Sequence, residues 1–186
     1  MTGRTPVTVE LLPGPSAARS ASAILSVYAE VFAEPPYDEP ADALAAAAAR
    51  FPAQTTRPGF LAALATTSTG EPVGMAYGHA VPPDTPWWDE LNEPVPASMR
   101  HEDGRRTFGL MELAVRAPWR GQGIARHLHD TLLTDLTAER LLLNVHRSAT
   151  AASAAYRSWG YRKIGDSGPF GPRADRYEVM LLERPG

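Results

Sequence analysis

The chain has 186 residues and a mass of 20.1 kDa, which suits one ordinary domain, so we expect a single domain over residues 1–186. Its formal charge of −3 argues against a general nucleic-acid binder, and no apolar run approaches the roughly 20 residues that a bilayer span needs. The absence of cysteine excludes disulfides, thiolate metal ligands and a cysteine nucleophile. These features predict a cytoplasmic protein with neither nucleic-acid nor membrane partners.

The first half of the chain alternates helical and strand patterns. A strand is expected over 8–12, ended by the Pro13-Gly14-Pro15 run, and a helix capped by Ser16 is expected to run to about Phe32. A second helix is predicted over 42–50, where consecutive alanines favour helix but bury little surface. Apolar runs over 59–66 and 72–81, separated by a polar turn, predict a hairpin.

The second half begins with an irregular, proline-containing segment over 82–106, expected to be a long loop of the kind that is usually functional or disordered. Apolar patterns then predict strands over 108–115, 141–146 and 177–182, and helices over 124–136 and 150–159. Strands that precede and follow single helices indicate an α/β fold with at least one parallel strand pair.

The turn after the strand 108–115 is the most informative segment. Gly121 and Gly123 allow close approach of a ligand to the backbone where an amphipathic helix begins. The free N–H groups and the dipole of that helix start favour an anion, and Arg116 and Arg120 add positive charge. The turn therefore predicts a cradle for a phosphate or pyrophosphate.

Two phosphate-binding alternatives fit less well. No G-x-x-x-x-G-K-[ST] run exists for a P-loop. A dinucleotide fingerprint would need a small residue where Arg126 stands, and an acid near the end of the strand 141–146. An NAD-type oxidoreductase stays open as the weaker alternative.

Two segments resemble one family. The run from Arg120 to Ala125 resembles the R/Q-x-x-G-x-G/A signature of the GNAT superfamily of acyl-CoA-dependent N-acyltransferases. Downstream, the family's A-x-x-x-Y-x-x-x-G-[FY] pattern is matched by Ala152, Tyr156, Gly160 and Tyr161. The resemblance implies an α/β (α+β) fold with a mixed, mostly antiparallel sheet of about six to seven strands, flanked by about four helices.

The same resemblance implies where acetyl-CoA would bind as co-substrate, with no metal. The pantetheine arm would pair with the backbone of Leu113, Ala114 and Val115, and the pyrophosphate would be held by Arg120, Gly121, Gln122, Gly123, Ile124 and Ala125. The alternative is a glycine-rich helix start that only packs tightly.

Glu112 is the candidate general base. Strand alternation places it on the face opposite Met111 and Leu113, and a lone carboxylate in an apolar strand is costly unless it is paired or lies in a cleft. Desolvation would raise its pKa, which suits a group that accepts a proton from an ammonium substrate. The alternative is a structural ion pair with an arginine.

Tyr156 is the candidate general acid, because the family resemblance places a tyrosine here near the thioester sulfur. The alternative is packing, since Tyr156 belongs to an apolar helical stripe. Tyr37, Trp87 and Trp88 are candidate walls of an acceptor site, although both tryptophans could equally pack the loop onto the domain. The consecutive His101-Glu102-Asp103 side chains are expected to be solvated rather than to bind metal.

Together these residues predict direct transfer of an acetyl or short acyl group from CoA to a primary amine of a small molecule or peptide. A non-catalytic module that binds acyl-CoA is the other alternative. A homodimer stays open, since dimers are frequent in the family.

Overall fold

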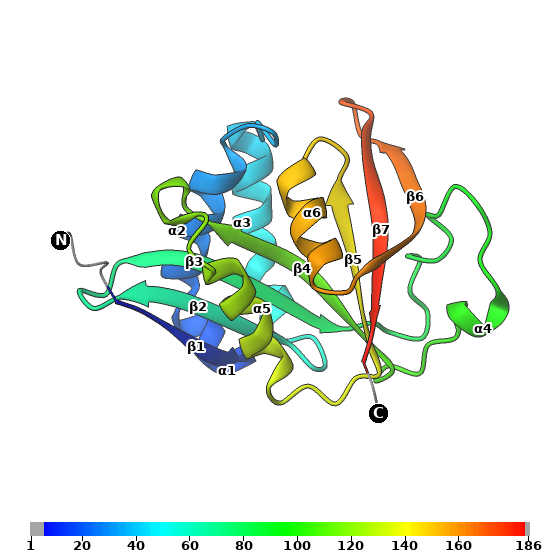
Figure 1. Ribbon diagram of the computed structural model, residues 1–186, viewed down its shortest axis with the longest axis horizontal. Helices are drawn as coiled ribbons and strands as arrows, with labels where there is room; N and C mark the ends of the chain where they lie inside the picture. The colour runs from blue at the N-terminus through cyan, green and yellow to red at the C-terminus, as the bar shows by residue number, and fades with distance from the viewer. Residues whose placement is uncertain (1–5, 185–186) are drawn as a thin grey trace. The chain divides into compact units, whose positions relative to one another are not determined.

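The computed structural model describes residues 6–184 (Figure 1). Its elements in chain order are β1 (Val7–Pro13), α1 (Gly14–Arg19), α2 (Ala21–Phe32), α3 (Ala41–Thr55), β2 (Leu61–Thr67), β3 (Pro72–Ala80), α4 (Ala97–Arg100), β4 (Thr107–Val115), the 3-10 helix η1 (Ala117–Trp119), α5 (Ile124–Leu133), β5 (Arg140–His146), α6 (Thr150–Ser158), β6 (Arg162–Phe170) and β7 (Asp175–Glu183). Over these residues the seven strands follow the order β1-β2-β3-β4-β5-β7-β6. The expected fold class is confirmed, including a parallel pair, β4 with β5.

The chain forms two compact units. One holds residues 6–79 together with Met111–Leu136, and the other holds Ala80–Leu110 together with residues 137–184. Strand β4 contributes its second half to the first unit and its first half to the second. The single domain over residues 1–186 stays a prediction.

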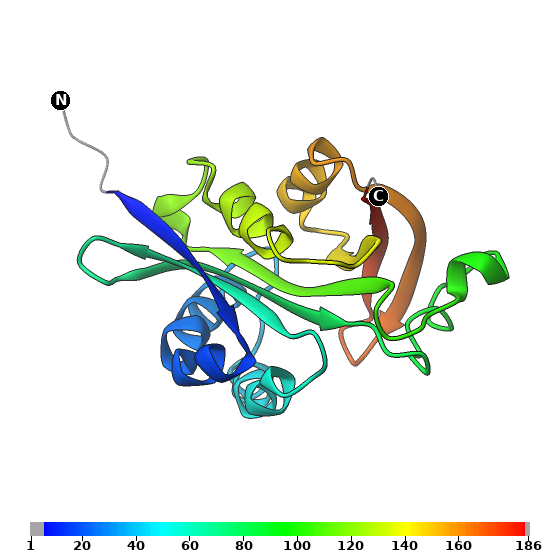
Figure 2. The same ribbon diagram turned by 90° about the horizontal axis from the view of Figure 1, so that it is seen from below.

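The first unit is a sheet covered on both faces. Helices α1, α2 and α3 lie on one face of β1, β2 and β3, and α5 lies on the other (Figure 2). Such a sheet needs strands that are apolar on both sides, and β3 is buried at every position from Val73 to His79. Gly74 allows α5 to approach, because a Cβ there would lie 3.0 Å from Leu128 Cδ1. The core beneath α2 and α3 includes Ile24, Val27, Phe51, Leu64, Met75 and Tyr77.

The helices of this unit differ from the sequence prediction in three places, one of which is α5, which ends at Leu133 rather than at Leu136. The single helix expected up to Phe32 is divided at Ser20, whose ψ of 12° interrupts it, and Pro13 rather than Ser16 stands at its N-cap. Helix α3 continues past Arg50 to Thr55 with Pro52 inside it. The extension buries the Phe51 side chain, which is 1% exposed, so core packing outweighs the helix-breaking tendency of proline.

The second unit is built on β5 and β7, which pair antiparallel along the full length of β5. Helix α6 is tied to β7 at Glu178, whose Oε2 accepts from Ser153 Oγ at 3.0 Å and from Arg157 Nη2 at 2.7 Å. The apolar cluster of this unit contains Trp88, Leu142, Val179 and Leu181.

Strand β6 lies next to β7 and was not predicted from the sequence. Its residues lack regular alternation, and its pairing with β7 shifts register twice. The segment expected as a loop over 82–106 is irregular except for the short α4, and it is bound to β6 through a bridge between Leu91 and Ser167. Across residues 6–184 none of the helices has the length and apolar character that a bilayer crossing demands.

Candidate active site

The turn between β4 and α5 keeps the backbone open. Gly121 and Gly123 adopt φ values of 70° and 81°, in the left-handed region that disfavours residues with a Cβ. A Cβ built on either glycine would meet no atom within 4 Å, so free space adjoins the turn. No side chain caps the N-terminus of α5, and its positive end is left for an anion. The residues present therefore fit a phosphate group.

The residues predicted to contact acetyl-CoA lie close together in the chain, within residues 113–125 of the first unit. Leu113, Ala114 and Val115 end β4; Arg120, Gly121, Gln122 and Gly123 form the turn; Ile124 and Ala125 begin α5. The Gln122 side chain donates to the Pro118 carbonyl at 3.1 Å, and Ile124 is buried. These contacts fix the turn from within.

The two arginines of the turn are bound by glutamates of the first unit. Arg116 Nε lies 3.1 Å from Glu30, and Arg120 Nη2 lies 3.0 Å from Glu34. Arg120 Nε also donates to the Val115 carbonyl at 2.9 Å, which braces the turn. The positive charge expected beside the cradle is thus largely neutralised, and the backbone N–H groups remain as its anion-binding element.

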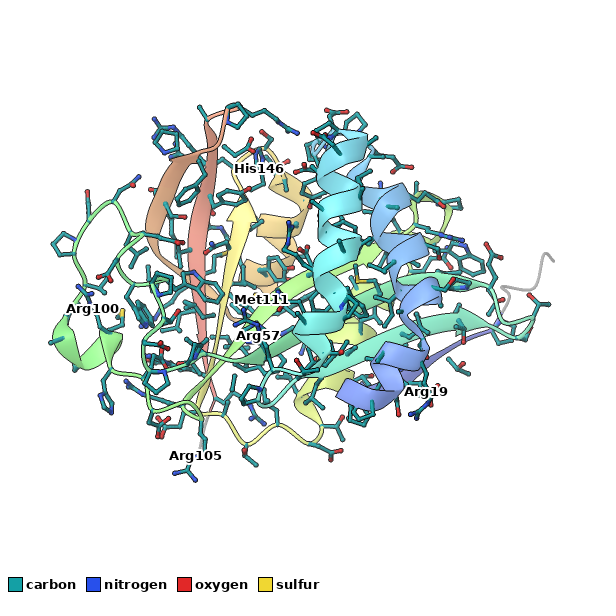
Figure 3. The ribbon with its side chains drawn as sticks, turned by 180° about the vertical axis from the view of Figure 1, so that it is seen from behind. Arg19, Arg57, Arg100, Arg105, Met111 and His146 are labelled. Atoms are coloured by element: carbon teal, nitrogen blue, oxygen red, sulfur yellow. The ribbon has the colours of Figure 1, made fainter. Side chains whose placement is uncertain are left out.

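Glu112 lies half-buried on β4 and directly follows Met111 in the chain, the residue of this strand that is labelled in Figure 3. Burial raises the pKa of its carboxyl to about 8; Glu39 acts in the same direction and Arg50 opposes it. Among residues 6–184 no arginine lies within ion-pair distance of Glu112, so the structural ion pair considered from the sequence does not form. A carboxyl group in this state can accept a proton near neutral pH.

Two tyrosines of the first unit interact electrostatically with Glu112. Tyr77, on β3, has a pKa raised by burial and then by the charge of Glu112. Tyr37, in the α2–α3 connection, has a pKa raised for the same two reasons. The Tyr37 ring packs 4.7 Å from Phe32, which packs 4.5 Å from Tyr28. The sequence analysis named Tyr37 as a candidate site residue but did not name Tyr77, because the sequence around Tyr77 is that of an ordinary buried strand.

Tyr156 lies on α6 in the second unit and is 8% exposed. Its ring meets those of Trp159 and Tyr161 edge to face, at centroid distances of 5.4 and 5.5 Å. The packing role considered from the sequence is therefore present.

The two tryptophans have different surroundings. Trp88 is 4% exposed, and its indole N–H donates to Glu102 Oε1 at 3.1 Å, so it has the packing role left open by the sequence. Trp87 is half-buried and donates to Asn144 Oδ1 at 2.8 Å. Only Trp87 keeps surface that a ligand could contact.

Glu102 is not solvated as the sequence suggested. It is 6% exposed and forms an ion pair with Arg140 Nη2 at 2.9 Å, while Thr107 Oγ1 donates to it at 2.8 Å. The Arg140 guanidinium also lies 5.1 Å from the ring centre of Trp88. Its burial removes Glu102 from the exposed trio, and in the part of the chain that the structure describes no group of three or more His, Cys, Asp and Glu residues could hold a metal ion.

Comparison with known proteins gives the family. The model of the acetyltransferase (GNAT) family matches residues 22–161, a range that includes Glu112, the glycine turn and Tyr156. The chain belongs to the GNAT acetyltransferase family. Members of this family use acetyl-CoA and act on amine acceptors, and membership argues against the NAD-type alternative. No curated protein matches the chain in sequence.

Solved structures show the same fold at low identity. The ribosomal-protein-S18-alanine N-acetyltransferase from Escherichia coli is 18% identical, with 97% of each chain covered and a TM-score of 0.63. The NatC complex bound to Gag peptide and CoA is 14% identical over 96% of this chain and 99% of that one, with a TM-score of 0.66. Nourseothricin acetyltransferase is 18% identical over 69% of this chain and 67% of that one, with a TM-score of 0.51.

Proposed function

We propose that the protein transfers an acetyl or other short acyl group from a CoA thioester directly to a primary amine. The observation that carries the proposal is Glu112, a carboxyl with no ion-pair partner among the described residues and a pKa raised to about 8, on the strand that leads into the glycine turn. A base for an ammonium ion and a cradle for a pyrophosphate are the two requirements of this reaction.

The chemistry assigns one proton transfer to each of two side chains. Glu112 takes a proton from the acceptor nitrogen, directly or through water, so that the nitrogen lone pair can attack the thioester carbonyl. The C–N bond then forms and the C–S bond breaks. Tyr156 donates its phenolic proton to the departing thiolate, a transfer against the ordinary pKa order of about 10 and about 8.5 that close positioning would have to assist.

The turn holds the co-substrate while its carbonyl reacts. The backbone N–H groups at the start of α5 would bind the pyrophosphate, and the ends of Leu113–Val115 would align the pantetheine arm. Holding both reactants in one geometry accounts for a large part of the rate in reactions that form no acyl-enzyme. The absence of cysteine from the sequence agrees with such direct transfer.

The test is release of free CoA from acetyl-CoA in the presence of a panel of primary amines. Glu112→Gln and Tyr156→Phe should each lower kcat/KM by about 100-fold or more, the usual contribution of a positioned acid or base. Matched controls are Glu183→Gln, at the end of β7, and Tyr161→Phe, the buried neighbour of Tyr156. Unchanged rates in the two site variants would show that the assigned roles are wrong, and acetyl-CoA binding without turnover would favour the non-catalytic module.

A further inference from the structure

Two ion pairs connect the glycine turn of the first unit to α2 and to the residues just after that helix. Arg116 Nε lies 3.1 Å from Glu30, and Arg120 Nη2 lies 3.0 Å from Glu34. The two arginines are four positions apart in the chain, and so are the two glutamates. Two contacts in sequence fix the orientation of the turn as well as its position, which one contact could not do.

Arg116 is the more buried of the two arginines. Its side chain is 17% exposed, and besides Glu30 it reaches Glu71 at 3.5 Å and Ser26 Oγ at 3.4 Å. Its backbone N–H donates to the Val73 carbonyl at 2.9 Å. Arg116 thus ties the start of the turn to α2, to β3 and to the β2–β3 connection.

Arg120 is folded back onto the protein. Its Nε donates to the carbonyl of Val115, the last residue of β4, at 2.9 Å, while its Nη2 binds Glu34. A Cβ built on Gly123 would have no atom within 4 Å, so the Arg120 guanidinium lies outside the open space beside this glycine. The observed contacts of Arg120 therefore brace the turn from outside the cradle.

The backbone of Glu34 is itself held in place. Its carbonyl accepts from the N–H groups of Tyr37 and Asp38, each at 3.1 Å, and its own N–H donates to the Val31 carbonyl at 3.3 Å. Glu30 lies within α2, which is fixed by its buried face. Carboxylates on such a fixed backbone can set the positions of the arginines that they bind.

We propose that Glu30 and Glu34 are positioning residues of the co-substrate site. By holding Arg116 and Arg120, they keep the turn in the arrangement in which its backbone N–H groups bind the pyrophosphate of acetyl-CoA. The turn needs this support because its two glycines give the backbone wide conformational freedom, and a turn that is ordered before binding loses less entropy when the ligand arrives. The inference rests on the proposed function and deepens it by naming residues that act on co-substrate binding through others.

The experiment uses the sign of the change in acetyl-CoA affinity. If the two arginines bound the pyrophosphate themselves, the glutamates would compete with it, and neutralising them would strengthen binding. As positioning residues, they should weaken binding when they are neutralised. Glu30→Gln and Glu34→Gln should each raise the Kd measured by calorimetry about threefold, and about tenfold together, in line with the modest strength of half-exposed ion pairs.

Kinetics and a second variant separate positioning from loss of folded protein. Unfolding lowers kcat and the number of binding sites but leaves Kd unchanged, whereas mispositioning should raise the KM for acetyl-CoA with kcat little changed at saturation. Glu34→Asp, which keeps the charge, should recover part of the affinity lost in Glu34→Gln. In an Arg120→Gln background, Glu34→Gln should have no further effect, because its partner is already gone.

The matched control is Glu10→Gln, since Glu10 is an exposed acid of β1 in the same unit, and its Kd should equal that of the parent. An unchanged or lower Kd in Glu30→Gln and Glu34→Gln overturns the positioning role, and so does an equal effect of Glu34→Gln with and without Arg120. If the parent binds acetyl-CoA but acetylates no amine, acyl transfer fails while the Kd values still decide the positioning role; if the parent does not bind acetyl-CoA, both fail.

Discussion

At the scale of single residues, Glu112 combines a half-buried position with acidic and aromatic neighbours. Removal from water disfavours its charged form, and Glu39 adds repulsion, so its pKa rises to about 8. A base with this pKa is half deprotonated at slightly alkaline pH. Its strength as a proton acceptor is correspondingly greater than that of an ordinary carboxylate.

The pH dependence of kcat/KM should report this group. Activity should rise with pH through an apparent pKa of about 8, because only the deprotonated carboxylate accepts a proton. Glu39→Gln removes a like charge, so it should lower the pKa of Glu112 and move the rise to lower pH. The pKa of the acceptor amine is the same in both proteins and cannot produce the shift. Asp42→Asn, which alters another acid of the first unit, should leave the midpoint in place; an unmoved midpoint in Glu39→Gln contradicts the assignment.

Part of the site around Glu112 could be predicted from the sequence. The alternation of β4 predicted that Glu112 faces away from Met111 with a raised pKa, and the pKa follows that prediction. Arg50 and Tyr77 could not be found this way, because they come from α3 and β3 and their relation to Glu112 depends on packing between elements. For Trp88 the sequence left packing and ligand contact open, and its burial against Glu102 and Arg140 depends on contacts that no local pattern indicates.

At the scale of elements, the backbone conformation of the β4–α5 turn favours the binding of an anion. Gly121 and Gly123 hold left-handed backbone at a helix start that no side chain caps. The sequence predicted this turn well, because two glycines ahead of an amphipathic helix are a local signal. Strand β6 was missed because its pairing with β7 depends on two register shifts rather than on its own pattern.

Gly123→Ala, compared with a control at another left-handed glycine, separates the effect on acetyl-CoA binding from the effect of backbone strain. The substitution strains a residue at φ 81° by about 1–2 kcal/mol and places a methyl group in the open space of the cradle. Acetyl-CoA affinity measured by calorimetry should fall at least about tenfold, or about 1.4 kcal/mol. Gly70→Ala is the control, because Gly70 has φ 84° and an equally open surround in the β2–β3 turn. Equal affinities of the two variants for acetyl-CoA would contradict the cradle.

The irregular connection between β3 and β4 is held in place by a buried ion pair. Its residue Glu102 is buried against Arg140 of β5, so the irregular segment is tied to the sheet of the second unit by an ion pair shielded from water. Glu102→Gln should destabilise the protein by about 3–5 kcal/mol in denaturant unfolding, because it leaves the Arg140 charge buried without its partner. Glu139→Gln, which breaks the exposed pair with Arg106, should cost less than about 1 kcal/mol. A similar cost for both would mean that burial does not strengthen the Glu102 pair.

At the scale of the whole molecule, a net charge of −3 accompanies a turn built to bind a polyanion. The two facts agree because backbone N–H groups bind anions without adding formal charge, and because Glu30 and Glu34 already balance Arg116 and Arg120. Net charge therefore argues against a general nucleic-acid binder but could not reveal the turn. Homodimer formation stays a prediction.

Ligand-induced stabilisation tests the co-substrate on the intact protein. Acetyl-CoA at 100 times its Kd should stabilise the folded state by about 2.7 kcal/mol, because it binds that state alone. For a chain of this size the gain corresponds to a rise in Tm of about 5–11 °C. NADH at the same concentration should leave the Tm unchanged. A rise with NADH and none with acetyl-CoA would contradict the acyl-transfer proposal.

The raised pKa of Glu112 also has a thermodynamic consequence for folding. Its carboxyl has a pKa of about 8 when folded and an ordinary value of 4.5, so between these pH values the folded state binds more protons than the unfolded state. The contribution of this group to the free energy of unfolding therefore falls as pH rises from 4.5 to 8 and is constant above. Glu112→Gln, which has no charge to bury, should raise the Tm relative to the parent at pH 8.5 and lose that advantage at pH 4.5. The proposed base thus makes the folded state least stable at the alkaline pH at which it would react fastest.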